Sequence, residues 1–174
     1  MAGGYGAGSA ANSKWLINTV YAPTTVTRAE TFVWYQATPQ IQVGVAYLWK
    51  QSAFRALGSV QFITETDHRP SVSASVGVQG IGTGNPGYSL TAEKNWRLPE
   101  GTFNMFAGIG LRSNEKHGHP LGGLKWTTPE GITLGYQHDG HDGHPFATYG
   151  RGMYFGGVYL ISGQRPALMF GVRF

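Results

Sequence analysis

The sequence predicts an all-β fold, a transmembrane up-and-down antiparallel β-barrel of about 12 strands. Charged residues make up only 13% of the chain, against about 25% in an average soluble domain. Aromatic residues make up a further 13%, and glycine occurs 27 times. Apolar and polar residues alternate in short runs, and no apolar run reaches the ~20 residues of a membrane helix. A glycine-rich soluble β-sandwich is the alternative fold.

Each alternating run is bounded by turn residues, which is typical of strands. In the third run, for example, Val43 and Val45 fall on one face and Gln42 falls on the other. We expect strands, in chain order, at residues 13–21, 28–37, 40–50, 55–65, 71–81, 87–98, 102–112, 122–128, 131–138, 144–150, 152–161 and 166–174.

The chain therefore divides into two parts, a flexible N-terminal segment at residues 1–12 and the barrel at residues 13–174. The first part is rich in Gly, Ala and Ser. It lacks the basic start and apolar core of a signal peptide. We interpret it as a start from which the export signal has been removed.

The connections between the runs also alternate in length. Longer Gly-, His- and Pro-rich connections fall at residues 80–87, 113–121 and 138–144, with short turns between. Barrels of this class place short turns on the periplasmic side and longer loops outside. An even number of strands returns both termini to the periplasmic side.

The last run places Leu168, Phe170 and Phe174 on one face and ends on that aromatic residue. An alternating terminal strand of this kind is typical of the signal read by the outer-membrane insertion machinery. We therefore expect a bacterial outer-membrane location, with the lipid bilayer or detergent and the insertion machinery as partners.

Aromatic residues on the apolar faces group near the strand ends, with aliphatic residues between them. Two such belts are typical of the two membrane interfaces, because the rings are apolar and the Tyr and Trp tips bind water. The predicted interface aromatics are Trp15, Tyr35, Trp96, Trp126 and Phe174 on the periplasmic side, and Tyr47, Trp49, Tyr88 and Tyr136 on the outer side.

The opposite faces then line a polar, slightly basic lumen. This pattern predicts a small passive pore for anions, small solutes or saccharides, since charged side chains bias permeation. The alternative is a plugged structural or adhesive barrel that acts through its outer His-rich loops. The predicted pore-lining residues are Lys14, Arg28, Glu30, Glu65, Glu93, Arg97, Arg112, Lys125 and Arg173.

Five of the six histidines lie in or beside two outer loops, His117 and His119 in one and His138, His141 and His144 in the other. If the two loops meet across the rim, these imidazoles and the nearby carboxylates form a candidate site for zinc, nickel or copper. The predicted ligands are His138, His141 and His144. The alternative is a polar loop in which Asp and Gly serve turn formation. No nucleophile, base and orienting group share a recognisable pattern, so we predict no enzyme activity and no cofactor. No basic run indicates nucleic-acid binding.

Short blocks, most of them rich in Gly, recur between Pro70 and Gly140. They are Val76–Gly82, Thr91–Lys94, Gly108–Leu111, Gly122–Trp126 and Gly135–Gly140. The spacing of these blocks resembles that of YjbH-like outer-membrane barrels linked to exopolysaccharide export. The resemblance implies a barrel and a polysaccharide-related function, and it supplies no catalytic residues.

Overall fold

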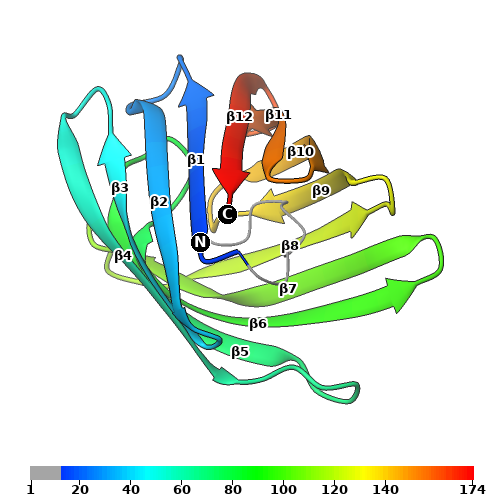
Figure 1. The fold of residues 1–174 in the computed structure, drawn as a ribbon. Coiled ribbons are helices and arrows are strands. Elements are labelled where there is room, and N and C mark those ends of the chain that lie inside the picture. Colours follow the sequence, from blue (N-terminus) through cyan, green and yellow to red (C-terminus); the bar gives the residue numbers. More distant parts are fainter. Residues whose placement is uncertain (1–12) are drawn as a thin grey trace.

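In the computed structural model, which describes residues 13–174, the chain forms a closed barrel of 12 antiparallel strands (Figure 1). The predicted flexible segment, residues 1–12, lies outside the described residues. The strands are β1 (Trp15–Ala22), β2 (Arg28–Thr38), β3 (Ile41–Leu48), β4 (Ala53–Ile63), β5 (Ser71–Val78), β6 (Pro86–Leu98), β7 (Gly101–Arg112), β8 (His119–Thr127), β9 (Ile132–His138), β10 (Gly143–Arg151), β11 (Tyr154–Ile161) and β12 (Arg165–Arg173).

The predicted all-β up-and-down barrel is confirmed, since each strand pairs with its sequence neighbour and β1 pairs with β12. The largest boundary differences are at β5, which ends at Val78 rather than at residue 81, and at β8, which begins at His119 rather than at residue 122. Its first residues, His119 and Pro120, pair with Gly110 and Ile109 of β7. No helix within residues 13–174 is long and apolar enough to cross a membrane.

The seam between β1 and β12 brings the ends of the barrel sequence together. The Trp15 amide donates to the Phe174 carbonyl at 2.8 Å, and the Phe174 amide donates to the Trp15 carbonyl at 3.0 Å. Trp15 and Phe174 thus lie together at one end of the barrel. We call this the turn end, with connections at 39–40, 64–70, 99–100, 128–131 and 152–153. The opposite end is the loop end, with connections at 23–27, 49–52, 79–85, 113–118, 139–142 and 162–164.

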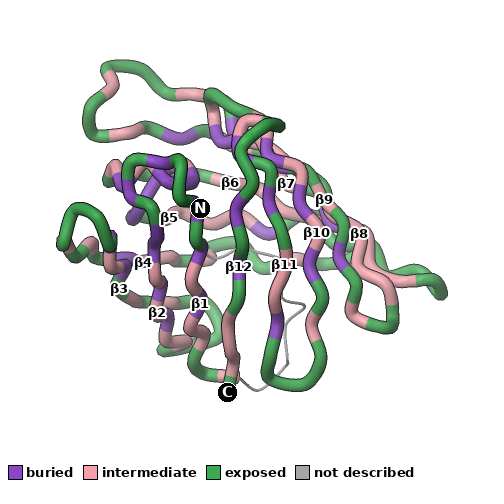
Figure 2. The backbone as a smooth tube through the Cα atoms, turned by 90° about the horizontal axis from the view of Figure 1, so that it is seen from above, coloured by how far each residue is buried: buried purple, intermediate pink, exposed green. Residues whose placement is uncertain are grey.

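Side chains alternate between the outside and the inside of the barrel. On β12, Leu168 and Phe170 are 54% and 58% exposed, whereas Ala167 and Met169 are each 2% exposed. Figure 2 shows the resulting alternation of buried and exposed positions along β12 and its neighbours. This is the period of two that a pleated strand imposes.

The interior contains an apolar cluster as well as polar residues, which differs from the expected polar lumen. Inward positions on β1, β2, β10, β11 and β12 carry large apolar side chains that pack against one another inside the barrel. The buried members are Val20, Ala22, Phe32, Trp34, Ala46, Leu48, Leu57, Val78, Ile81, Phe146, Phe155, Tyr159, Ile161, Ala167 and Met169.

Close strand contact at Gly44 yields a prediction about stability. A Cβ at this inward position of β3 would lie 2.3 Å from the carbonyl oxygen of Val33 on β2. Because backbone cannot move aside cheaply, we expect Gly44→Ala to lower the free energy of unfolding by roughly 1–3 kcal/mol. Denaturant unfolding of refolded protein measures the change.

Gly58→Ala is the matched control, since a Cβ there meets only the Val76 side chain at 3.3 Å. An equal loss of stability in both variants would contradict the steric explanation.

Candidate functional site

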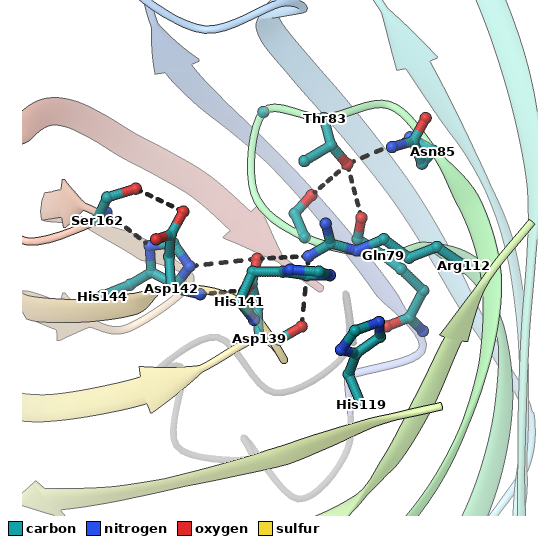
Figure 3. Close-up of polar contacts among 12 residues, drawn as sticks. Gln79, Thr83, Asn85, Arg112, His119, Asp139, His141, Asp142, His144 and Ser162 are labelled. Carbon is teal, nitrogen blue, oxygen red and sulfur yellow. Dashed lines mark hydrogen bonds and ion pairs between the residues drawn. The ribbon is translucent and has the colours of Figure 1, made fainter. Parts of the chain in front are cut away.

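The densest polar network lies at the loop end, where the connections 79–85, 113–118, 139–142 and 162–164 approach one another (Figure 3). Arg112, the last residue of β7, forms an ion pair with Asp139 of the neighbouring loop at 3.1 Å. Asp139 also lies 3.3 Å from Nε2 of His144 on β10. The Asp139 side chain is only 8% exposed and the His144 side chain is 1% exposed, so the network is buried in the barrel mouth.

The backbone fixes the orientation of His144. The Ser162 amide donates to Nδ1 of His144 at 3.2 Å. Nδ1 therefore carries a lone pair, which assigns the ring proton of the neutral imidazole to Nε2, facing Asp139. In addition, the Ser162 hydroxyl donates to Asp142 at 2.8 Å. The 162–164 loop and the 139–142 loop are thereby joined.

Asp139 also organises its own loop. Its Oδ1 accepts the amides of His141 at 3.1 Å and Asp142 at 3.0 Å. Burial alone raises the pKa of Asp139, but the hydrogen bond from His144 and those from the loop amides outweigh it. The pKa of Asp139 is held well below its ordinary value of 3.8, so the carboxylate is ionised.

A second cluster stands beside this network. Oε1 of Glu115 lies 2.8 Å from Nε2 of His141, and Oε2 of Glu115 lies 3.1 Å from Nε2 of His119. The centroids of the two imidazole rings are 4.2 Å apart. Arg112 lies 3.7 Å from the same carboxylate.

The structure does not gather the predicted metal ligands His138, His141 and His144 into one site. His144 is committed to Asp139, and His138 ends β9 in pairing with Gly143 and Gly122. Within residues 13–174, the ligand-type side chains that converge are those of Glu115, His119 and His141. Among these residues, His119 is one of the loop histidines named from the sequence but not one of the predicted ligands, and Glu115 is missed by sequence reasoning. Their closeness to His141 depends on two loops meeting across the β8–β9 pair.

The 79–85 loop folds inward over the barrel mouth. Ile81 is 6% exposed and belongs to the apolar cluster, and the Gly82 amide donates to Oε2 of Glu30 at 3.3 Å. The Thr27 amide donates back to the Gly82 carbonyl at 3.4 Å. Gly82 has φ of +73°, and a Cβ there would meet Thr25 at 2.6 Å. This loop therefore packs inward against the barrel wall at the loop end.

Below this loop, the interior holds a cavity of about 430 Å³ that reaches toward the turn end. Glu93 and Lys125 line it, and Asn104 donates to Glu93 at 2.6 Å. Other polar lining residues are Gln36, Gln40, Gln42, Ser59, Gln61, Ser71, Ser73, Ser75, Thr91, Asn95 and Gln137.

Glu65 lines the same cavity from the 64–70 connection. Burial alone raises the pKa of Glu65, but hydrogen bonds from Asn95 and the charge of Lys94 outweigh it and hold the pKa below 4.5. Asn95 donates to Glu65 at 2.7 Å, and Lys94 lies 3.4 Å away.

The remaining predicted pore-lining residues lie elsewhere. Glu30 is buried beneath the 79–85 loop, and Arg112 belongs to the Asp139 network. Arg173 lies at the turn end and donates to the Gly152 carbonyl at 3.5 Å. The predicted pore-lining residues that are exposed near the barrel ends are Lys14, Arg28 and Arg97.

All of the predicted interface aromatics face outward. Trp15 pairs with Tyr35 across β1 and β2, and their ring centroids are 4.8 Å apart. Trp96 pairs with Phe103, which pairs in turn with Trp126. At the loop end, the Trp49 indole N–H donates to Thr31 at 2.9 Å. Among the other members, Tyr47 is half-buried, and the exposed ones are Tyr88, Tyr136 and Phe174.

No family model matches this chain, and neither does any curated protein or solved structure. The resemblance to YjbH-like barrels therefore stays a prediction.

The Asp139 network yields a prediction about pH. Because the folded pKa of Asp139 lies below the unfolded value, its stabilisation is complete above that value and is lost as pH falls through the folded pKa. We expect Asp139→Asn to lower the free energy of unfolding by about 1–3 kcal/mol at neutral pH. The gap between wild type and variant should narrow below pH 3.8, the ordinary value for this carboxyl.

Urea unfolding of both proteins across this range measures the gap. Asp142→Asn is the control, because Asp142 is an exposed carboxylate of the same loop whose side chain accepts the Ser162 hydroxyl. If the difference in free energy of unfolding between wild type and Asp139→Asn did not change with pH, the assigned role of Asp139 would be contradicted.

Proposed function

We propose that this barrel spans a bacterial outer membrane and acts as a plugged scaffold that presents its loop end to the outside. The outer surface supports a membrane location. Large apolar side chains are exposed on it from many strands, among them Phe54 at 68%, Leu134 at 56% and Phe170 at 58%. Contiguous apolar surface of this extent is an aggregation liability in water, and a bilayer covers it.

The outward-facing aromatic residues also support a membrane location. At the turn end, the pairs Trp15–Tyr35 and Trp96–Phe103 lie side by side on adjacent strands. Between the two ends, outward positions carry aliphatic residues such as Val45, Leu90 and Met105. Aromatic belts that flank an aliphatic band fit two membrane interfaces.

The 79–85 loop, which we call the plug, supports the proposal of a closed lumen. Loop 79–85 is anchored to the barrel wall through Gly82 and Glu30, and it adds Ile81 to the buried apolar cluster. Inward-facing apolar side chains exclude water, so they oppose ion passage on that side of the lumen. A barrel that is closed in this way interacts with the outside through its loops.

A small pore is the second candidate. The cavity of about 430 Å³ favours it, because Glu65, Glu93 and Lys125 line a space that reaches the turn end. In that case the 79–85 loop would be the gate, and the solute would be a small anion or a saccharide. The resemblance to YjbH-like barrels is consistent with a saccharide.

The membrane proposal is tested with single-tryptophan variants in which the other four Trp residues are replaced by Phe. In vesicles of brominated lipid, we expect strong quenching of Trp96, which is 38% exposed, and weaker quenching of Trp34, which is 4% exposed inside the barrel. Equal and absent quenching of both in folded protein would overturn the membrane location.

The plug is tested by conductance in planar bilayers. We expect wild type to be silent and Gly82→Val to produce discrete current steps, because the added side chain collides with Thr25 and displaces the loop. Gly163→Val is the matched control. Gly163 has a similar φ of +68° in another loop at the same end, but nothing lies within 4 Å of its Cβ position.

Heat-modifiable gel migration shows that each variant is folded. Discrete steps from wild type would overturn the plugged scaffold and favour the pore. If both valine variants produced current steps, the cause would be backbone strain in a loop rather than displacement of the plug.

A further inference from the structure

We propose that Glu115, His119 and His141 form a binding site for a divalent transition metal at the loop end of the barrel. Glu115 lies in the 113–118 loop, His119 opens β8, and His141 lies in the 139–142 loop. Their side chains come from segments that are separate in sequence, and Figure 3 shows His119 and His141 close to the Arg112–Asp139 pair.

The spacing of the ligand atoms suits a single ion. One ligand atom from each of the three residues lies within 4.8 Å of the other two, and the two Glu–His separations are 2.8 and 3.1 Å. Metal–ligand distances of about 2.0–2.2 Å in a tetrahedron place ligand atoms roughly 3.3–3.6 Å apart. Small side-chain rotations are therefore enough to reach that geometry, and the backbone stays in place.

The surrounding structure holds the ligands in position. Asp139 accepts the His141 amide at 3.1 Å and so fixes the turn that carries this ligand. Gly140 has φ of +102°, and a Cβ there would lie 2.7 Å from the His119 side chain. A glycine at this place thus lets the 139–142 loop pack directly against the second ligand.

Arg112 borders the site. It lies 3.7 Å from Glu115 but 3.1 Å from Asp139, which is the more buried of the two carboxylates. Arg112 is therefore the closer partner of Asp139, while the Glu115 carboxylate faces the two imidazoles. Arg112 also orients that carboxylate, as residues around metal ligands commonly do.

The donor set indicates the class of metal. Two imidazole nitrogens and one carboxylate oxygen suit Zn²⁺, Ni²⁺, Cu²⁺ or Co²⁺, whereas Ca²⁺ and Mg²⁺ prefer oxygen ligands throughout. His141 is 38% exposed, so the site is open to solvent on one side. The His117 ring lies 4.7 Å from that of His119 and is close enough to supply a fourth ligand. Water is the other source.

This inference does not depend on whether the barrel conducts or stays plugged. It is tested on the full chain, folded in detergent, by calorimetric titration with Zn²⁺ and by visible absorption with Co²⁺. We expect one ion per chain. The d–d bands of Co²⁺ should show tetrahedral coordination, and Cu²⁺ should show electron paramagnetic splitting from two nitrogens.

Variants locate the ligands. We expect His119→Gln, His141→Gln and Glu115→Gln each to weaken Zn²⁺ binding by about tenfold or more. His68→Gln, at the turn end, and His138→Gln, in the predicted but ungathered set, are matched controls that should bind as wild type does.

Folded wild-type protein that binds no stoichiometric metal would overturn the site and leave the Glu–His contacts as ion pairs only. Equal weakening by His138→Gln would overturn the assignment of ligands. Neither result bears on the conductance or lipid-quenching experiments, so the two proposals fail separately.

Discussion

The hydrogen bonds between β1 and β12 close the sheet, and the rest of the structure depends on this closure. They run from Leu16–Arg173 to Tyr21–Leu168, and the Trp15–Phe174 amides extend them to the chain end. An open sheet of 12 strands has two edges with unpaired backbone groups. Closure pairs these groups, which is also the condition for placing strands in a hydrocarbon environment.

Closure turns simple alternation into two surfaces with different roles. Outward positions form an apolar exterior, and inward positions share a confined interior. The interior is uneven, because large inward side chains such as Trp34, Phe146 and Phe155 fill one part of it. Serine and asparagine leave space elsewhere, and this space is the polar cavity around Glu93 and Lys125.

The loop end owes its order to a few anchors. Glu30 receives the 79–85 loop, Asp139 ties Arg112 to His144, and Ser162 joins the last loop to this group. Glycines with positive φ, such as Gly82, let these loops approach one another closely. Ordered loops then bring Glu115 and the neighbouring histidines within reach of a single ion.

The sequence by itself determined the strands, their alternation and the outward aromatic residues, because each of these follows from a local period of two. Each predicted range overlaps an observed strand, although bounds such as the start of β8 differ, and Trp15 and Trp96 are exposed on the outer surface. Only the tertiary structure decided that the 79–85 loop turns inward. It also decided that His141 contacts Glu115 instead of joining His138 and His144 in one site. These contacts join segments far apart in sequence, so they depend on barrel closure, strand register and loop packing, which no local pattern specifies.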